Sequence, residues 1–304
     1  MRVFLTGASG FVGSHVARIL RAHGHDVHAL VLPGEDAACA GDVAVVRGDL
    51  VNPESYRVAL ANIAPEACIH AGWYANPKDY LGSRLNVGLL AASTSLVSML
   101  VDLGCRRLVG VGTCFEYDVS YGWLSEGSAL APRHLYSTCK RALFDVASSL
   151  CVGTSTRFAW ARLFFLYGPR ESQGRLVPAV MGALLRGEEA RVTMGEQIRD
   201  FLHVADAAAG LVHVMESSLA GPVNVASGRP VAVREVVATI ARLVEASGRP
   251  SRVAYGAVPA RAGDPPFVCA SVERLAGAGF RPAFDLETGL ANTIEWARAS
   301  ETMA

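Results

Sequence analysis

Tyr136 and Lys140 stand four residues apart in a segment of helical apolar spacing, so they are expected to share one face of a helix. An ammonium beside a phenol favours the phenolate and lowers a pKa that is about 10 in water. Tyr136 could then donate or accept a proton at neutral pH, with the hydroxyl of Thr113 as a third polar group. An ordinary exposed pair at the same spacing is the alternative.

A glycine-rich turn near the N-terminus predicts a binding site for a dinucleotide. Its three glycines, which lie between a short apolar run and a segment of helical spacing, are Gly7, Gly10 and Gly13. Gly7 allows the tight turn, Gly10 lets a pyrophosphate approach the backbone, and Gly13 lets the helix pack close to the strand. The amides of Phe11 and Val12 would then point from a helix N-terminus at the phosphates.

Apolar runs and helical patterns alternate along the chain behind this turn. Strands are expected at residues 3–5, 26–32, 43–46, 67–71 and 107–112. Helices are expected at residues 11–20, at 86–103 and from about residue 135 onward. Strands that alternate with helices imply right-handed crossovers between parallel strands. The sequence therefore predicts an α/β fold, a Rossmann doubly wound parallel sheet.

The end of the second strand normally selects the cofactor. An acidic side chain there binds the ribose hydroxyls of NAD, whereas an arginine accommodates the 2′-phosphate of NADP. This chain has Val31 and Leu32 at that point, so it carries neither signal. The missing acid favours NADP, with NAD as the alternative.

The ends of the next strands should complete the cofactor site. Asp49 and Leu50 follow the third strand, where the carboxylate could reach the adenine amine or simply cap its loop. The small residues Ala71 and Gly72 end the fourth strand and leave room for the cofactor. Trp73 comes next, and it could line a substrate pocket or form an apolar plug over the sheet.

Three histidines, His23, His25 and His28, lie just before and within the second strand. A metal site needs ligands that converge with suitable geometry. A helix–strand junction followed by a strand gives no such indication, so we expect solvated histidines and no metal site.

Composition excludes several functions. Lys plus Arg equals Asp plus Glu at 28 each, and no basic stripe indicates a nucleic-acid partner. We expect no signal peptide and no apolar run long enough to span a bilayer, hence no membrane partner. Seven scattered cysteines without a C-x-x-C pair, at positions 39, 68, 105, 114, 139, 151 and 269, are typical of reduced thiols. These features predict a soluble cytoplasmic protein.

The motifs together resemble those of the extended short-chain dehydrogenases/reductases that act on nucleotide-linked sugars. TGASGFVG at residues 6–13 matches the cofactor turn of that family, and Thr113, Tyr136 and Lys140 match its catalytic triad. The segments that match those flanking its nucleotide-sugar site are RLFFLYGP at 162–169, RDFLHVAD at 199–206 and NVA at 224–226. The resemblance covers nearly the whole chain. It implies an NAD(P)-binding Rossmann domain at 1–175 and a smaller C-terminal substrate-binding lobe at 176–304, with some strand exchange between them.

The resemblance also implies partners. Arg199 and Arg261 would clamp the diphosphate of a nucleoside-diphosphate sugar, a role that suits guanidinium groups, although each could form a surface ion pair instead. Lys140 would hold the nicotinamide ribose. A homodimer would form through the two helices near residues 89–103 and 136–150.

Departures from the family pattern narrow the reaction. The 4,6-dehydratases of the family place Asp-Glu directly after the triad threonine, where this chain has Cys114 and Phe115. Many 4-epimerases carry an asparagine where this chain has Phe165. We therefore expect an NAD(P)H-dependent 4-ketoreductase of a nucleoside-diphospho-4-keto-6-deoxyhexose, as in deoxysugar biosynthesis. An NAD-dependent 4-epimerase is the alternative, and a non-catalytic dinucleotide sensor is disfavoured by the intact triad.

Overall fold

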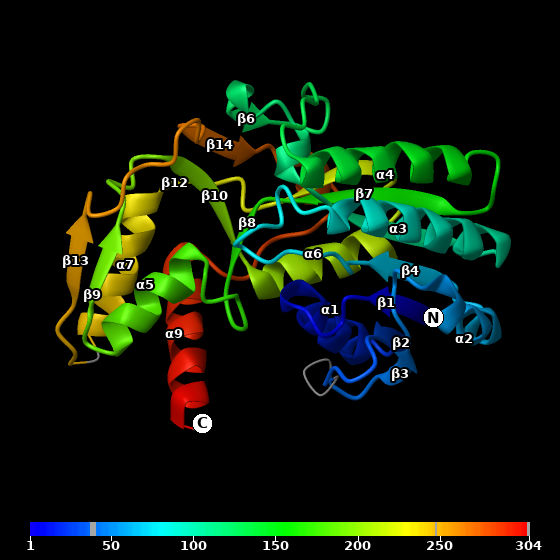
Figure 1. Cartoon of the computed structure of the whole chain (residues 1–304), viewed down its shortest axis with the longest axis horizontal. Helices are drawn as coiled ribbons and strands as arrows, with labels where there is room; N and C mark the ends of the chain where they lie inside the picture. The colour runs from blue at the N-terminus through cyan, green and yellow to red at the C-terminus, as the bar shows by residue number, and fades with distance from the viewer. Residues whose placement is uncertain (37–40, 247, 303–304) are drawn as a thin grey trace.

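A seven-stranded parallel sheet forms the centre of the computed structural model, which describes residues 1–36, 41–246 and 248–302 (Figure 1). Its strand order is β11-β7-β5-β4-β1-β2-β3. The strands are β1 (Arg2–Thr6), β2 (Asp26–Val31), β3 (Ala44–Arg47), β4 (Ala67–His70), β5 (Arg107–Thr113), β7 (Arg157–Leu163) and β11 (Gly221–Val225). Central strands such as β4 and β5 are buried along their whole length, as a sheet covered on both faces requires.

Helices cover both faces of this sheet (Figure 1). On one face α1 (Phe11–Ala22) packs beside α6 (Val204–Glu216), and their apolar side chains share one core with β1, β2 and β11. On the other face lie α2 (Arg57–Ile63), α3 (Leu85–Asp102) and α4 (Leu135–Cys151). The predicted Rossmann-like α/β fold is confirmed, and the predicted elements end within two residues of the observed ones.

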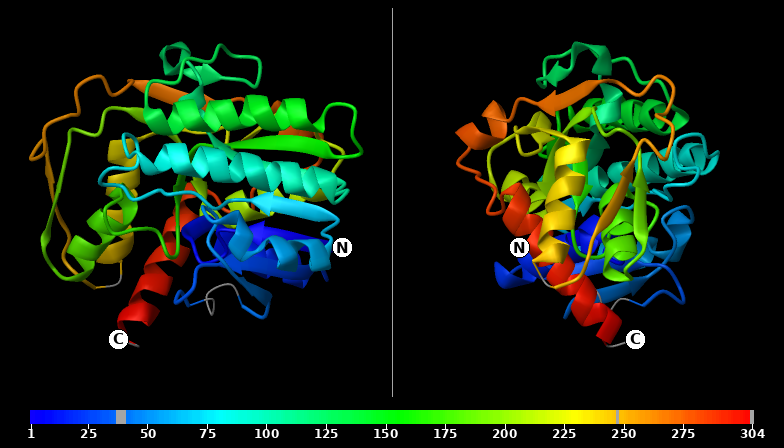
Figure 2. Two further views of the ribbon diagram at one scale, coloured as in Figure 1. Left: turned by 45° about the vertical axis from the view of Figure 1, so that its right-hand side comes forward. Right: turned by 90° about the vertical axis from the view of Figure 1, so that its left-hand side faces the viewer.

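The C-terminal third builds most of a second unit beside the carboxyl ends of the central strands. One small sheet has the order β12-β10-β14-β6, with β8 also paired to β10, and a second pairs β13 with β9. Its strands are β6 (Trp123–Leu124), β8 (Phe165–Tyr167), β9 (Glu189–Val192), β10 (Ile198–His203), β12 (Pro230–Ala232), β13 (Arg252–Tyr255) and β14 (Phe267–Ala270). Its helices are α5 (Leu176–Leu185), α7 (Val233–Glu245) and α9 (Leu286–Thr302), whereas α8 (Glu273–Gly277) packs against β11 of the central sheet. Figure 2 shows α7 in yellow packed beside α9 in red at the end of the molecule.

Helix α3 corrects one expectation from the sequence. Among the helices of the described ranges it alone is long and apolar enough to cross a membrane, with 18 residues, although no such run was expected. It packs Leu96, Val97 and Leu100 against the sheet, as a core helix does.

The structure also tests the expectations for the cysteines and the histidines. The six described cysteines are free and buried, and Cys39 lies outside the described residues. The expectation of solvated histidines is wrong for His25, which is buried beside the carboxylate of Glu216. Glu216 comes from the distant end of α6, so the spacing of the histidines alone could not indicate this contact.

Candidate active site

The glycine-rich turn and the end of β4 meet at the carboxyl edge of the sheet. Gly7 has a φ of +77°, and a Cβ added to it would lie 2.8 Å from the backbone of Gly72. A Cβ on Gly13 would lie 2.0 Å from the carbonyl oxygen of Gly7, so only glycine lets α1 approach the turn so closely. The Gly72 amide donates a hydrogen bond of 2.9 Å to Oγ1 of Thr6, which joins the two segments. Ala71 lies between them, half-buried against the core of this face.

The N-terminus of α1 follows this turn. Gly10 donates its amide to the Gly7 carbonyl oxygen at 3.0 Å and is the N-cap of α1, where it provides no side-chain hydrogen bond. Phe11 and Val12 therefore begin the helix with their amides directed away from it, which suits a phosphate. Asp49 caps its own loop by accepting the Val51 amide at 3.1 Å.

His70, which the sequence did not single out, connects the turn to the helix layer. Its Nδ1 lies 2.7 Å from Oγ1 of Thr6, and its Nε2 lies 2.8 Å from Oγ of Ser93 on α3. Burial lowers the pKa of His70 to about 3, so the ring is neutral and acts as a hydrogen-bonding link. This link fixes the position of Thr6 beneath the turn.

The three predicted catalytic residues come together at the same edge. Thr113 is the buried last residue of β5, and Tyr136 and Lys140 lie one turn apart at the start of α4. Burial and the nearby Tyr80 raise the pKa of Tyr136 well above 10.0, and the adjacent Thr113 side chain offsets only part of this increase. The predicted lowering of the Tyr136 pKa by Lys140 is therefore wrong for this conformation.

Lys140 explains that difference. Its Nζ donates to the Val111 carbonyl oxygen at 2.7 Å and lies 4.0 Å from the ring centroid of Trp73, so its charge is directed into the core. Burial lowers the pKa of Lys140 to about 7, against the opposing charge of Glu116. The ammonium is thus close to its titration point at neutral pH.

Glu116 is a buried carboxylate that the sequence analysis missed. Its Oε1 accepts the Thr113 amide at 2.9 Å, and its Oε2 accepts Nε of Arg162 at 2.8 Å. Nε1 of Trp160 donates to both oxygens at 3.0 Å. The carboxylate side chain is 0% exposed and the guanidinium side chain 1%. This network holds the turn that presents Thr113.

Trp73 lies on the inner side of the site. Its Nε1 donates to Oδ1 of Asn86 at 2.8 Å, and the fully buried Asn86 donates to the carbonyl oxygens of Tyr80 and Ser83. The Tyr80 ring contacts the Tyr136 ring edge-on at a centroid distance of 5.0 Å. The segment after β4, which includes Trp73, is therefore held by hydrogen bonds and packs against Tyr136, the predicted proton donor.

The two arginines that were predicted to bind the diphosphate lie on the second unit. Arg199 is buried, and its Nη2 donates to Asp264 at 2.7 Å. Its guanidinium carbon lies 5.3 Å from the Phe165 ring centroid, and Phe165 in turn contacts Phe115 edge-on. Arg199 is thus brought next to the turn that follows Thr113, whereas Arg261 is exposed on the loop that carries Asp264.

An acidic residue also lies beside the glycine-rich turn, which the sequence analysis did not find. Glu35 follows β2 by four residues, and its Oε2 accepts the Ser9 hydroxyl at 2.7 Å. Nη1 of Arg47 donates to the Glu35 carbonyl oxygen at 2.7 Å and to that of Leu32 at 3.2 Å. An acid about 20 residues beyond the glycines is the usual partner of a ribose 2′-hydroxyl.

Comparison with known proteins assigns this arrangement to a family. The model of the NAD dependent epimerase/dehydratase family matches residues 3–226. The chain belongs to this family. The resemblance to the extended short-chain dehydrogenases/reductases is confirmed, as is the class of NAD-dependent enzymes of nucleotide sugars.

Three similar proteins differ in the names of their reactions and ligands. The dTDP-glucose 4,6-dehydratase of Streptomyces griseus is 30% identical, over 97% of this chain and 93% of that protein. The dTDP-4-dehydro-6-deoxy-D-allose reductase of Streptomyces bikiniensis is 28% identical, over 97% and 96%. The structure of MoeE5 in complex with UDP-glucuronic acid and NAD is 30% identical, with a TM-score of 0.83 over 99% of this chain and 100% of that one. A dehydratase and a reductase are thus about equally similar to this chain.

Proposed function

We propose that this protein reduces the C4 ketone of a nucleoside-diphospho-4-keto-6-deoxyhexose. The observation that carries the proposal is the placement of Thr113 at the end of β5 and of Tyr136 at the start of α4, next to each other beside a glycine-rich turn, with no acidic residue at positions 114 and 115. Two hydroxyls at one point can bind and protonate a single carbonyl oxygen. A sensor that only binds a dinucleotide would need neither.

In this reaction the chain supplies orientation and a proton, and the bound dinucleotide supplies the hydride. Tyr136 gives its hydroxyl proton to the C4 oxygen as negative charge develops there. Thr113 hydrogen-bonds the same oxygen and fixes the ketone relative to the sheet edge. Lys140 would bind the hydroxyls of the nicotinamide ribose through its ammonium group.

Water elimination is disfavoured by the side chains that follow Thr113. Burial, with the charges of Asp200 and Glu116, raises the pKa of Cys114 to about 12, and Phe115 has no proton to transfer. Glu116 is held in its buried ion pair with Arg162. These residues support a reductase over a dehydratase, even though a dehydratase is among the relatives.

A 4-epimerase is the second candidate, because the family name and the shared triad both allow it. An epimerase oxidises and then re-reduces the same sugar, so the intermediate must turn over within the pocket. Phe165 is packed between Phe115 and Phe201, with ring centroids 6.1 and 6.2 Å away. This filled aromatic contact disfavours the turning motion and supports reduction in one direction.

Glu35 supports NAD as the preferred dinucleotide. This differs from the expectation of NADP, which rested on the absence of an acidic residue at Val31 and Leu32. A carboxylate beside Ser9 can accept the ribose hydroxyls of NAD, and it would repel the 2′-phosphate of NADP. A positive charge at Arg47 would favour NADP, but its guanidinium is engaged by two backbone carbonyls.

The remaining parts of the proposal concern the two units and the assembly. We assign residues 1–175 to dinucleotide binding and 176–304 to the nucleotide sugar, with Arg199 and Arg261 toward its diphosphate. Exposed apolar side chains on α3 and α4, among them Val87 and Val146, suit a homodimer through these helices. We place the enzyme in the cytoplasm, in keeping with its free cysteines. Light scattering on the eluting protein should give twice the chain mass, and a monomer would refute the dimer.

The test mixes the enzyme with NADH or NADPH and a 4-keto-6-deoxy sugar nucleotide, and follows the absorbance of the reduced cofactor. Stoichiometric oxidation is expected with wild type, and Tyr136→Phe should lose about 10²–10⁴-fold in kcat while still binding the cofactor. Conversion of an intact hexose nucleotide into its C4 epimer, without net oxidation, would favour the epimerase. Full activity of Tyr136→Phe would refute the assigned role of the tyrosine.

A further inference from the structure

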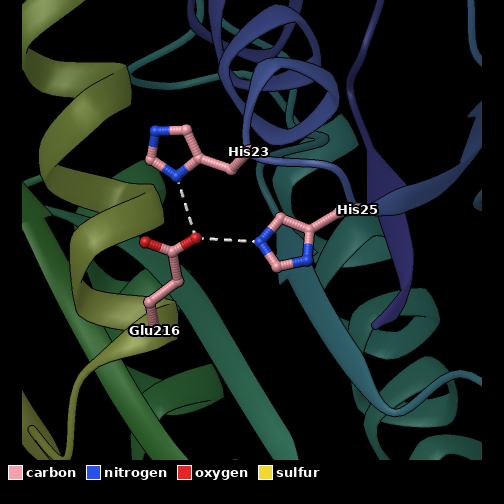
Figure 3. Close-up of side chains that lie close together, drawn as sticks. All are labelled: His23, His25 and Glu216. Atoms are coloured by element: carbon pink, nitrogen blue, oxygen red, sulfur yellow. Dashed lines mark hydrogen bonds and ion pairs between the residues drawn. The ribbon is translucent and has the colours of Figure 1, made fainter.

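Two imidazoles converge on one carboxylate away from the candidate active site (Figure 3). Nδ1 of His23 lies 2.9 Å, and Nε2 of His25 lies 2.8 Å, from Oε1 of Glu216. One ligand atom from each of the three side chains lies within 4.8 Å of the other two. His23 and His25 lie between the end of α1 and the start of β2, and Glu216 lies at the end of α6, which is far from both in sequence.

The backbone holds all three residues firmly. His23 is the C-cap of α1, and its amide bonds back to the carbonyl oxygens of the last turn. Gly24 follows with a φ of +76°, which reverses the chain so that both rings point the same way. On the other side, Arg107 donates to the carbonyl oxygens of Val214 and Met215 and so fixes the last turn of α6, which ends at Glu216.

Two imidazole nitrogens and one carboxylate oxygen form a donor set that suits Zn²⁺ and related divalent transition metals. Ligand atoms about 2.1 Å from a tetrahedral ion lie about 3.4 Å apart, so the nitrogens would move outward by about half an ångström. The exposed fractions of the side chains are 48% for His23 and 33% for Glu216, so an ion and its water can enter. His25, with 9% exposed, forms the inner wall.

We infer that His23, His25 and Glu216 bind a divalent transition-metal ion of the Zn²⁺ class, with water completing the coordination. Binding moves the ring proton of each imidazole away from the coordinating nitrogen and leaves the carboxylate ionised. The positive groups that face the cluster are the guanidinium of Arg21, which donates to the His25 carbonyl oxygen, and the amino group of Met1, 3.5 Å from Nδ1 of His25. They limit the affinity, and the Glu216 carboxylate offsets part of their charge.

The position of the cluster assigns the ion a structural role. His25 directly precedes β2, so it lies at the amino edge of the parallel sheet. The glycine-rich turn follows β1 and lies at the carboxyl edge, with the triad. The ion would therefore tie the α1–β2 turn to the end of α6 and stabilise the fold without touching substrate or cofactor.

The experiment titrates untagged, metal-free protein with Co²⁺, read by its visible absorption, and with Zn²⁺, read by calorimetry. One ion per wild-type chain is expected, together with a rise in the melting temperature as Zn²⁺ is added. His23→Ala and Glu216→Gln should each weaken metal binding by at least about 100-fold. Loss of a residue that only hydrogen-bonds to a metal ligand already lowers metal affinity by about 10–100-fold, and these variants lose a ligand itself. Both side chains are partly exposed, so these variants should fold.

His28→Ala is the matched control. His28 lies on β2 three residues beyond His25, and its Nε2 is 3.2 Å from Asp26, outside the cluster. This variant should bind the ion as wild type does. The proposal is overturned if wild type binds no stoichiometric ion, or if His23→Ala binds it equally well. It is also overturned if Zn²⁺ leaves the melting temperature unchanged while His23→Ala lowers it. The three side chains would then stabilise the fold through their hydrogen bonds alone.

Discussion

The buried pair of Glu116 and Arg162 is the place where removal of one charge should cost most. Neither side chain is more than 1% exposed, and their closest atoms are 2.8 Å apart. Breaking such a pair from one side leaves an uncompensated charge in the interior, which costs about 3–5 kcal/mol. A protein of ordinary stability has only about 5–15 kcal/mol in total. Glu116→Gln should therefore lose a large fraction of the free energy of unfolding.

The substitution is chosen because it changes charge with little change in volume. The oxygen of the introduced carboxamide could still accept from the Thr113 amide and from Trp160, but its NH₂ group would face the Nε–H of Arg162. Glu116→Gln combined with Arg162→Met removes the stranded charge as well. Replacement of a whole buried pair by apolar groups is often neutral, so the double variant should recover stability, with a coupling energy of about 1–3 kcal/mol.

The assay is urea unfolding, with the midpoints compared at a constant m value. Glu188→Gln is the matched control, since Glu188 forms an exposed ion pair with Arg186 at 2.8 Å and its loss should leave the midpoint unchanged. Two results would refute the reasoning. Either Glu116→Gln shifts the midpoint no more than the control does, or the double variant loses the sum of the two single losses.

Three further predictions concern the cofactor and the proton donor. Because the pKa of Lys140 is lowered to about 7, its charge is present below that pH and lost above it, so the rate of reduction should fall as pH rises through about 7. Lys140→Met should reduce the substrate slowly, at a rate that does not change with pH over this range. A wild-type rate that is independent of pH over the same range would contradict the role of Lys140. Gly13→Ala should abolish dinucleotide binding, measured by calorimetric titration, while the chain stays folded, because the added Cβ would lie 2.0 Å from the Gly7 carbonyl oxygen. Gly88→Ala on α3 is the control and should bind the dinucleotide normally, because a Cβ added there would meet no neighbouring segment within 4 Å. Glu35→Gln should narrow the difference in affinity between NADH and NADPH, and an unchanged ratio would argue against its contact with the ribose.

Local patterns made much of this structure predictable. The glycine-rich turn lies between one strand and one helix, and the spacing of Tyr136 and Lys140 is a property of a single helix. The alternation of strands and helices determines a parallel sheet with little choice of topology. These features depend on neighbours within about ten residues, so the sequence alone could place them.

Contacts between distant segments could not be predicted in this way. Glu116 pairs with Arg162 on β7, which lies 46 residues later in the chain. No local sequence pattern indicates a contact over such a separation. The same network explains two glycines of β5 that had no evident role. A Cβ on Gly110 would lie 2.5 Å from the Trp160 ring, and one on Gly112 would lie 2.5 Å from Oε1 of Glu116. His25 and Glu216 are 191 residues apart and were missed for the same reason.

The error over the Tyr136 pKa has a different origin. The spacing of the two residues on α4 was right, but spacing does not say where a long side chain points. Lys140 is directed toward Val111 and Trp73, so burial of the phenol outweighs the expected attraction. The charge of a lysine acts only where its ammonium lies, and that depends on the whole packing of the site.

Glu116 connects the stability of this site with its chemistry. The same carboxylate accepts the Thr113 amide and opposes the fall in the Lys140 pKa, while its charge is balanced by Arg162 on β7. Glu116 and its partner Arg162 thus influence two members of the proposed triad, the backbone position of Thr113 and the pKa of Lys140. Loss of the Glu116 charge should therefore lower the Lys140 pKa further and shift the pH at which reduction slows below about 7. Such a shift, measured at a temperature where Glu116→Gln is folded, would separate its electrostatic effect from its effect on stability.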